Sequence, residues 1–383
     1  MNIQTIQIIR LSLPTDQWDL IIIDTDDGRR GWGEISSSMN IYGVAYAVEL
    51  LSPLLLGKDP SCVESLTAEM ERWEYPSKVS LRCFRTAISG LNQALWDLYA
   101  KELGIPLHSL YGASDRKSVK LYANLNKALR KDRRAELQGS AAEKALNEGF
   151  SFVKCTPFDE IDPTKWEFDD AKAFEKLNAV MSNVPVGRVA IDCHQRFRRC
   201  SLAQTIEKIL SLYGNPFWIE DTVPINDWES QRIVTQKFPQ IMFAAGEDAL
   251  NIKQIMNIAT SGTYDVIMPD VKYIGGPSVI KSIIPVIEAM ASHVSLHNPN
   301  GIIATAHSAH LTAIAKYGTP LEFPFGAVPE RSELSDTPEV ITNGTYVFNT
   351  LPGIGIGIND AALKTFGSVL SQGKWIPYQG GRK

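Results

Sequence analysis

Residues 216–247 read PFWIEDTVPINDWESQRIVTQKFPQIMFAAGE, and this stretch decides the fold. A short apolar run, Pro216–Glu220, ends in an acidic residue, and a second run, Ile241–Glu247, ends in another one. The two glutamates are 27 positions apart (247 − 220). That spacing is typical of one strand, one helix and the loops that join them, so the stretch predicts a repeat in which strands alternate with helices.

The same alternation continues on both sides of this stretch, from about Val119 onward. Short apolar runs alternate with amphipathic helical segments, and eight such runs are typical of a closed parallel barrel. No GxGxxG motif follows an early strand, which disfavours a dinucleotide-binding fold. The predicted barrel strands are Val119–Ala123, Phe150–Cys155, Val186–Asp192, Pro216–Glu220, Ile241–Glu247, Tyr264–Pro269, His293–His297 and Thr319–Glu322.

The two ends of the chain have a different pattern. Strand-like segments at Ile3–Leu13 and Trp18–Asp24 and a turn at Asp27-Gly28 precede three helical stretches, which together predict an α+β unit. The tail from about Val340 returns to strand-and-turn composition and is expected to fold back onto that unit. We therefore predict an α/β protein with an N-terminal capping domain at 1–118, a (β/α) barrel at 119–339, and a C-terminal segment at 340–383 that completes the capping domain. The predicted helices of the first part are Val44–Leu55, Ser61–Trp73 and Val79–Leu103.

Bulk composition excludes several classes of protein. The chain has 383 residues and a net charge of −5, so it lacks the excess of basic residues that a nucleic-acid-binding protein needs. The longest apolar runs, such as Leu20–Ile23, are too short to cross a membrane, and the N-terminus does not read as a signal peptide. The five cysteines form no CxxC pair, which suggests reduced thiols in the cytoplasm.

Ionisable residues end nearly every predicted barrel strand. In a barrel the chemistry lies at the C-terminal ends of the strands, so these side chains are expected to surround one opening. From Asp192 onward they are separated by 28, 27, 23, 27 and 25 positions (from 220 − 192 to 322 − 297), close to one β/α repeat each time. The residues are Lys154, Asp192, Glu220, Glu247, Asp270, His297 and Glu322.

Three of these residues, Asp192, Glu220 and Glu247, lie on consecutive strands and form a candidate metal site. Three carboxylates that converge on one point repel one another strongly unless a cation lies between them. An all-oxygen ligand set of this charge suits Mg²⁺, with Mn²⁺ as an alternative.

The next two strands place Asp270 beside His297, which predicts a general base. A carboxylate bonded to one imidazole nitrogen fixes the tautomer and leaves the other nitrogen free to accept a proton. His307 and His310, on the following helix, are expected to be structural.

The motifs of the chain, in their order and spacing, resemble the mandelate racemase-like branch of the enolase superfamily over essentially the whole length. The resemblance implies a (β/α)₇β barrel with a capping domain built from both chain ends, and Mg²⁺ chemistry that removes the proton α to a substrate carboxylate. It also implies that Glu322 hydrogen-bonds the substrate carboxylate, and that the protein is a homo-oligomer. The motifs are Asp26-Asp27-Gly28, Gly31-Trp32-Gly33-Glu34, Ala94-Leu95-Trp96-Asp97-Leu98, Trp218-Ile219-Glu220-Asp221, Ala245-Gly246-Glu247, and Pro269-Asp270 with Gly275-Gly276.

Two departures from the racemases of this branch reduce the number of reactions that the resemblance implies. Racemases carry Lys-x-Lys after the second strand, whereas this chain has Lys154-Cys155-Thr156. Thr156 takes the place of the second lysine and is no base, so a two-base racemase is not expected; Lys154 is either a cation that binds the substrate carboxylate or a base. The second departure is His194, two positions after Asp192, which resembles the acid-sugar dehydratases, such as galactonate and mannonate dehydratase, where this histidine protonates the departing hydroxyl.

The leading prediction is therefore a Mg²⁺-dependent acid-sugar dehydratase that acts on a small-molecule sugar acid, with His297 as base and His194 as acid. One alternative is a cycloisomerase that acts on a sugar lactone or an anhydro sugar acid through the same enediolate; another, of a different class, is a non-catalytic protein that binds sugar acids. Specificity is expected from two capping-domain loops, Pro14–Trp18 and Ser37–Tyr42. The candidate substrate contacts are Glu322, Lys154, Thr156, Asn124, Trp18 and Tyr42.

Overall fold

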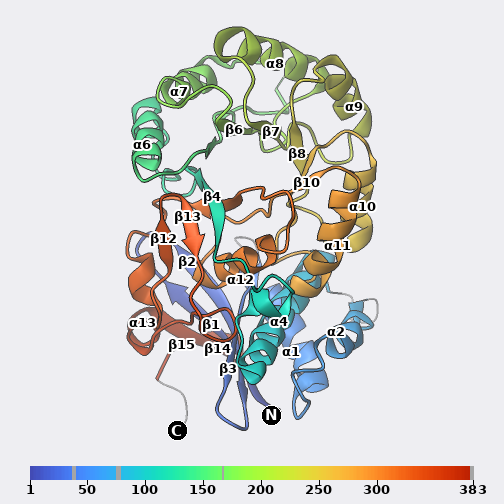
Figure 1. Ribbon diagram of the computed structural model, residues 1–383, viewed down its shortest axis with the longest axis vertical. Helices are drawn as coiled ribbons and strands as arrows, with labels where there is room; N and C mark the ends of the chain where they lie inside the picture. The colour runs from blue at the N-terminus through green and yellow to red at the C-terminus, as the bar shows by residue number, and fades with distance from the viewer. Residues whose placement is uncertain (37–39, 75–78, 166–167, 380–383) are drawn as a thin grey trace.

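A computed structural model describes residues 1–36, 40–74, 79–165 and 168–379. The chain forms a ring of strands surrounded by helices, and a second sheet with its own helices lies at one side of that ring (Figure 1). This arrangement is the predicted barrel with a capping domain.

The ring consists of eight strands that are short and parallel, in chain order around the barrel. The last of them, β11, returns to pair with the first, β4, so that Glu322 lies opposite Tyr122. Each of the eight predicted apolar runs overlaps one of these strands. The strands are β4 (Ser118–Asn124), β5 (Val153–Cys155), β6 (Val189–Asp192), β7 (Trp218–Glu220), β8 (Phe243–Ala245), β9 (Val266–Ile267), β10 (His293–Val294) and β11 (Leu321–Pro324).

Helices follow the strands and cover the outside of the ring, as Figure 1 shows for α6 to α11. The apolar faces of α6 to α11 pack toward the strands and their other faces are in solvent, whereas α12 is buried on all sides. The helices are α6 (Ala135–Asn147), α7 (Ala171–Met181), α8 (Arg199–Tyr213), α9 (Trp228–Lys237), α10 (Ile252–Thr260), α11 (Pro277–Ala289) and α12 (Ile302–Thr312).

One seam of the ring, between β10 and β11, has no strand pairing among the described residues. Side chains bridge this seam instead. The hydroxyl of Ser295 donates to the carbonyl of Pro320 at 2.8 Å, and the Asn298 amide donates to the carbonyl of Glu322 at 2.9 Å. The two strands are therefore held side by side by polar side chains.

Several strands end earlier than the sequence predicted. Strand β8 ends at Ala245, β9 at Ile267 and β10 at Val294, so Glu247, Asp270 and His297 lie on the loops that follow. Gly246 has a φ of +133°, which ends the extended conformation of β8. These three side chains therefore project from turns at the mouth of the barrel.

Large apolar side chains fill the inside of the ring below the mouth. Trp218 and Tyr122 meet edge to face with ring centroids 5.2 Å apart, and both are fully buried. Smaller side chains from β6, β8 and β9 complete this cluster. The interior is thus a packed core, and polar chemistry is confined to the mouth.

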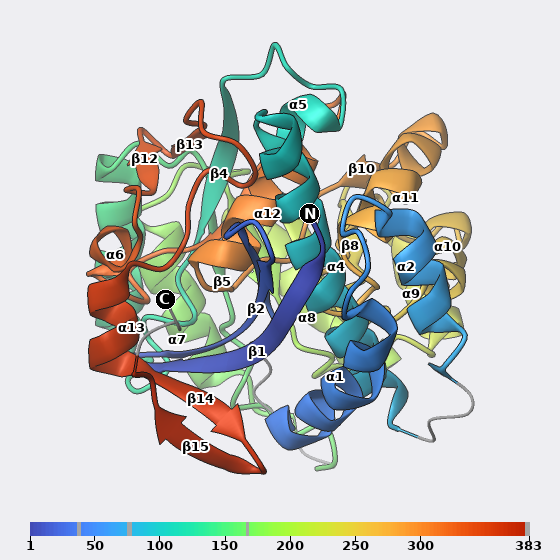
Figure 2. The ribbon, with the colours of Figure 1, turned by 90° about the horizontal axis from the view of Figure 1, so that it is seen from below.

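The capping domain is built around a five-stranded antiparallel sheet in the order β15-β14-β1-β2-β3. The long helix α4 lies against this sheet (Figure 2) and packs on β3. The contact with β3 depends on glycine. A Cβ at Gly33 would lie 2.0 Å from the carbonyl oxygen of Gly90, so a larger residue there would push strand and helix apart. The elements from the N-terminal part are β1 (Ile3–Ser12), β2 (Gln17–Thr25), β3 (Arg30–Glu34), α1 (Ile41–Leu55), α2 (Val63–Glu71), α4 (Leu81–Leu103) and α5 (Leu107–Leu110).

The C-terminal segment contributes to both parts of the molecule. Strand β13 pairs antiparallel with β4 and so extends the barrel sheet, whereas β14 pairs with β1 of the capping sheet. We predicted that the whole segment completes the capping domain, and its first hairpin instead joins the barrel. The elements are β12 (Val340–Thr342), β13 (Thr345–Val347), α13 (Asp360–Phe366), β14 (Gly367–Ser371) and β15 (Lys374–Pro377).

All five cysteines are free. Within the described ranges, no helix has the length and the apolar character needed to span a membrane.

Candidate active site

Lys154 lies at the centre of a group of carboxylates at the mouth of the barrel. Its ammonium nitrogen is 2.7 Å from Glu220 Oε1, 2.9 Å from Glu322 Oε1 and 3.2 Å from Asp192 Oδ2. The side chain is only 1% exposed. Burial alone would lower the pKa of Lys154, but the three carboxylates outweigh burial and raise the pKa well above its ordinary value. Lys154 is thus an ammonium group paired with three carboxylates, of which Glu220 accepts a hydrogen bond, and this pairing favours its charged form.

Glu247 lies apart from this lysine and contacts His297. The His297 Nε2 atom is 2.8 Å from Glu247 Oε2, and Nδ1 is 2.9 Å from Asp270 Oδ2. Asp270 is fully buried and also accepts the backbone N–H of Lys272 at 2.8 Å. The predicted pairing of Asp270 with His297 is therefore present in the structure. Burial opposes the charge on His297, but Glu247, Glu322 and Asp270 together raise the pKa of the imidazole well above its ordinary value.

Asp192, Glu220 and Glu247 form a row of carboxylates at the mouth, with His297 beside Glu247. His194 lies at the Asp192 end of this row, on a turn that follows β6. Because His194 follows Asp192 by two positions, a continued strand would place both side chains on one face. That geometry is wrong here: β6 ends at Asp192, and His194 has a φ of +46°. The turn still places the imidazole beside the carboxylate, because His194 Nε2 is 3.1 Å from Asp192 Oδ2. The backbone N–H of His194 also donates to Asp192 Oδ1 at 3.2 Å.

The second ring nitrogen of His194 has a partner that the sequence analysis missed. Nδ1 is 2.6 Å from Asp159 Oδ1, in the loop that follows β5, and Asp159 in turn is paired with Arg133. The pairing holds the orientation of the imidazole, as Asp270 does for His297. No spacing rule points to Asp159, because it lies in an irregular loop and not at a strand end.

Glu322 and Asn124, two predicted substrate contacts, bond to each other inside the protein. The Asn124 amide donates to Glu322 Oε1, and the backbone N–H of Asn298 donates to Glu322 Oε2 at 2.7 Å. With Lys154 on Oε1 as well, the Glu322 carboxylate is fully buried and well supplied with donors. Substrate contacts of Glu322 and Asn124 stay a prediction. The hydrogen bonds within the protein do not favour it, because they already use both carboxylate oxygens of Glu322.

Thr156 follows β5 and lies beside the mouth of the barrel. Its hydroxyl donates to Asn126 Oδ1 at 2.9 Å and accepts from Arg133 Nη1 at 3.1 Å. The side chain links two loops of the barrel. A substrate contact of Thr156 likewise stays a prediction.

Trp18 and Tyr42, the predicted capping-domain contacts, lie in very different surroundings. Trp18 is fully buried and its indole N–H donates to Asp16 at 3.0 Å, so the ring packs in the core and does not face a cavity. Tyr42, near the start of α1, is 55% exposed. Residues 37–39 of the loop Ser37–Tyr42 are outside the described residues.

Glu34, quoted above only as part of a motif, connects the capping domain to the loop that carries His297. Its fully buried carboxylate accepts the backbone N–H groups of Gly301 at 2.8 Å and Ala304 at 2.9 Å, in the first turn of α12. A negative charge at a helix N-terminus is favourable because the unpaired N–H groups there carry partial positive charge. Glu34 therefore fixes the start of α12, directly after the loop 297–301.

The donor set at the mouth fits a divalent cation. In the described parts of the chain, no three His, Cys, Asp or Glu side chains already form a metal-binding group, and the Lys154 ammonium group is paired with Asp192 and Glu220. The carboxylates nevertheless repel one another: burial, with a smaller effect from the neighbouring carboxylates and against the effect of Lys154, raises the pKa of Glu220 to about 8. Asp192, Glu220 and Glu247 supply the oxygen ligands that Mg²⁺ prefers.

Comparison with known proteins gives a consistent result for the whole chain. Residues 1–112 match the family described as "Mandelate racemase / muconate lactonizing enzyme, N-terminal domain", and residues 137–362 match "Enolase C-terminal domain-like". A D-gluconate dehydratase from Thermoproteus tenax is 28% identical, over 91% of this chain and 69% of that protein. A D-galactonate dehydratase from Verminephrobacter eiseniae is 27% identical, over 90% of each chain. A crystal structure of an enolase superfamily member from Salmonella Typhimurium superimposes with a TM-score of 0.84 at 22% identity, over 96% of this chain and 99% of that one.

A barrel with a capping domain, and with acidic side chains at the ends of consecutive barrel strands, defines an enolase-type enzyme. The chain belongs to the mandelate racemase/muconate lactonizing enzyme family of the enolase superfamily. The predictions of family and fold class are confirmed.

Proposed function

We propose that this enzyme is a Mg²⁺-dependent acid-sugar dehydratase. The observation that carries the proposal is the position of two imidazoles at the two ends of the carboxylate row. His297 contacts Glu247 and His194 contacts Asp192, and each has a second carboxylate on its other ring nitrogen. A dehydration needs one group that takes a proton and another that delivers one, and this site has both.

His297 is the proposed base. Asp270 holds its Nδ1, and Nε2 is directed toward Glu247. Glu247 is the largest of the charges that raise the pKa of His297, so a metal ion bound to Glu247 would favour the neutral imidazole that a base requires. Nε2 takes the proton from the carbon next to the substrate carboxylate, and the electron pair of that C–H bond moves into the carboxylate to give an enediolate.

His194 is the proposed acid. Hydroxide is a poor leaving group, so the β C–O bond breaks only as a proton reaches its oxygen, and such help is typically worth about 10²–10⁴-fold in rate. The proton comes from His194, the hydroxyl leaves as water, and the enediolate electrons form the new C=C bond. The enol that results tautomerises to a 2-keto-3-deoxy acid.

Lys154 and the metal supply positive charge. The Lys154 ammonium group stays charged between Glu220, Glu322 and Asp192, so we assign it an electrostatic role. Mg²⁺, held by Asp192, Glu220 and Glu247, would supply Lewis-acid stabilisation of the negative charge that develops on the substrate carboxylate. The dehydratase names of the two curated relatives support a hydro-lyase reaction for this chain as well.

The test is to measure α-proton exchange and elimination separately in D₂O, with a panel of aldonic and aldaric acids, with Mg²⁺ and after chelation. The wild-type enzyme should give 2-keto acid products only with the metal. His194→Gln should keep exchange and lose most of the elimination, whereas His297→Asn should lose both. The matched control is His293→Asn, at the opposite end of the barrel.

Each other outcome points to a different function or residue. Exchange that survives His297→Asn but not Lys154→Met would make Lys154 the base. A product of unchanged mass would favour the cycloisomerase. Tight binding of sugar acids without exchange or product, under any metal condition, would favour a non-catalytic binding protein and would refute the proposal.

A further inference from the structure

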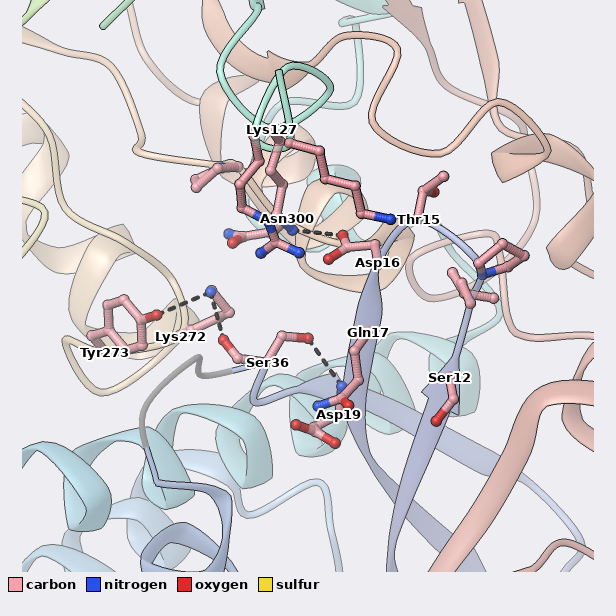
Figure 3. A pocket seen from close by; sticks show the side chains of 15 residues that line it. Ser12, Thr15, Asp16, Gln17, Asp19, Ser36, Lys127, Lys272, Tyr273 and Asn300 are labelled. Atoms are coloured by element: carbon pink, nitrogen blue, oxygen red, sulfur yellow. Dashed lines mark hydrogen bonds and ion pairs between the residues drawn. The ribbon is translucent and has the colours of Figure 1, made fainter. Parts of the chain in front are cut away.

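A cavity of about 530 Å³ lies between the capping domain and the barrel (Figure 3). On the capping side it is lined by residues 12–17, Asp19 and Ser36, and on the barrel side by loops that follow β4, β9 and β10. The capping residues include most of the loop Pro14–Trp18 that we expected to set specificity. A cavity of this volume accommodates a small sugar acid.

The cavity shares two loops with the proposed base and its partner Asp270. Lys272, which lines it, follows Asp270 by two positions and donates its backbone N–H to that carboxylate at 2.8 Å. Asn300, which also lines it, follows His297 by three positions on the same loop. A substrate that reacts at His297 therefore has this cavity as the space for its remaining carbons.

The described lining of the cavity is rich in positive charge. It includes four basic side chains and only two acidic ones, and both acids are already paired. Asp16 accepts from Lys127 at 2.6 Å, as Figure 3 shows, and Asp19 accepts from Arg10 at 2.7 Å. The basic side chains are Lys127, Arg130, Lys131 and Lys272.

Arg130 and Lys131 are the two cations of the lining that are not used within the protein. Both are exposed, and neither side chain makes a hydrogen bond or an ion pair with the described residues. Lys272, in contrast, donates to the carbonyl of Ser36 at 2.8 Å and to the Tyr273 hydroxyl at 3.2 Å. Two adjacent unpaired cations in a cavity wall are the feature that an anionic group would bind.

The cavity lining therefore has an excess of positive charge, whereas the carboxylate row of the proposed active site is rich in negative charge. The remaining lining offers hydroxyl and amide groups, among them Ser12, Thr15, Gln17 and Asn300, which suit the hydroxyls of a sugar chain. A sugar acid with one carboxylate would place a neutral CH₂OH end beside Arg130 and Lys131 and leave their charges unused.

We infer that the substrate carries a second anionic group at its far end, and that Arg130 and Lys131 bind this group. The substrate class is therefore a dianionic sugar acid, either an aldaric acid with two carboxylates or an aldonic acid with a terminal phosphate. This inference rests on the proposed function for the end of the substrate that reacts, but the binding of the far end is independent of the chemistry.

The experiment compares matched acids that differ only at the last carbon: galactarate with galactonate, glucarate with gluconate, and 6-phosphogluconate with gluconate. For each acid, kcat/KM for 2-keto product and the shift in thermal unfolding midpoint on binding are measured with Mg²⁺. We expect kcat/KM to be at least tenfold higher for one of the dianionic classes, and the carboxylate and phosphate pairs tell the two classes apart.

The double variant Arg130→Gln/Lys131→Gln should raise KM for the preferred dianion about ten- to a hundredfold, as expected for the loss of charge-assisted bonds, and should leave kcat much less affected. Arg232→Gln/Lys253→Gln, which removes one exposed cation each from α9 and α10, is the matched control and should behave as the wild type.

The two proposals fail in different ways. Equal or higher kcat/KM for the monoanionic partner in every pair would overturn the dianion inference and leave the dehydratase proposal standing. Absence of product from every acid would overturn the dehydratase proposal. Even then, a midpoint shift that only dianions produce, and that the double variant loses, would support the dianion inference. Absence of that shift would overturn the inference.

Discussion

Each imidazole of the proposed site has carboxylates on both ring nitrogens, and this residue-level detail determines what the imidazole can do. For His194, Asp192 lies on Nε2 and Asp159 on Nδ1. A carboxylate on Nδ1 keeps the proton on that nitrogen and fixes the ring plane, so that Nε2 is the atom that exchanges a proton with the substrate. Asp159 is therefore a positioning residue that acts through His194.

We predict that Asp159→Asn lowers the elimination rate about tenfold or more and affects α-proton exchange much less, because it disturbs the acid and not the base. The measurement is the ratio of exchange to 2-keto product in D₂O. Asp162→Asn is the control, because it removes an exposed carboxylate of the same loop that, among the described residues, bonds Thr164 alone. Equal losses of exchange and elimination in Asp159→Asn would mean a general structural role and would contradict the prediction.

Residue-level reasoning from the sequence identified groups at strand ends and the pairing of Asp270 with His297, but not a partner that lies within a loop. The near-constant spacing from Asp192 to Glu322 is visible because each repeat contributes one residue to one opening. Asp159 has no such regularity, since a loop conformation brings it to His194 over 35 positions. The burial of Trp18 was also not predictable, because an aromatic side chain in a strand packs in a core or lines a cavity equally well.

At the scale of elements, helix α12 links the two parts of the enzyme. Its N-terminus is held by Glu34 of β3, across 267 positions of sequence, and Arg331 donates to the carbonyl groups of Asn300 and Gly301 just before it. There is no room for another residue at Gly301, since a Cβ would lie 2.6 Å from Glu34 Oε2. The loop that carries His297 is thus fixed between two elements from distant parts of the chain.

We predict that Glu34→Gln destabilises the enzyme by about 1–3 kcal/mol, because a buried charge-assisted acceptor for two backbone N–H groups becomes a neutral amide with one acceptor. The thermal unfolding midpoint should fall by a few degrees. Glu136→Gln, at the exposed first turn of α6, is the matched control and should change the midpoint far less. An unchanged midpoint for Glu34→Gln would show that Glu34 does not hold α12.

The elements themselves were largely predictable, and their ends were not. Eight apolar runs predicted eight strands because each run must cross the buried wall of the barrel. The apolar run Ile241–Glu247 predicts a strand that continues to Glu247. In the structure, Gly246 leaves the extended conformation, so Glu247 lies on a turn. Backbone dihedrals of this kind depend on tertiary contacts that apolar periodicity does not encode.

At the scale of the whole molecule, the capping domain and the barrel meet across buried histidines that take no part in the proposed chemistry. His307 Nε2 is 2.9 Å from the carbonyl oxygen of Trp32 in β3, and His310 Nε2 is 3.2 Å from that of Ile354. The ring of His310 also stacks on His108 of α5, with centroids 5.0 Å apart. The expectation that His307 and His310 are structural agrees with this burial.

Burial holds both histidines in the neutral form. It lowers the pKa of His307 to about 4 and that of His310 to about 3, while His108 on the neighbouring helix adds to the second effect. The unfolded chain binds protons to these residues at an ordinary pKa of about 6.5, so below that pH it takes up more protons than the folded protein. The stabilisation is therefore fully present above about pH 6.5 and is lost as pH falls toward the folded pKa values.

We predict that His307 and His310 each lower the thermal unfolding midpoint as pH falls from about 6.5 to 4.5, with a full contribution of each histidine on the order of 3 kcal/mol. Glu220, whose pKa is raised to about 8, has the opposite effect on stability over the same range, so the contribution of each histidine is the difference in slope between the wild type and its variant. His310→Gln and His307→Gln should each make this dependence on pH shallower, even if the variant is less stable at neutral pH. The measurement is the slope of the midpoint against pH for each variant, which separates loss of a titrating group from loss of packing. Parallel slopes in the wild type and both variants would assign the acid sensitivity to other groups, whereas a shallower slope in each would show that neutral imidazoles hold the capping domain on the barrel.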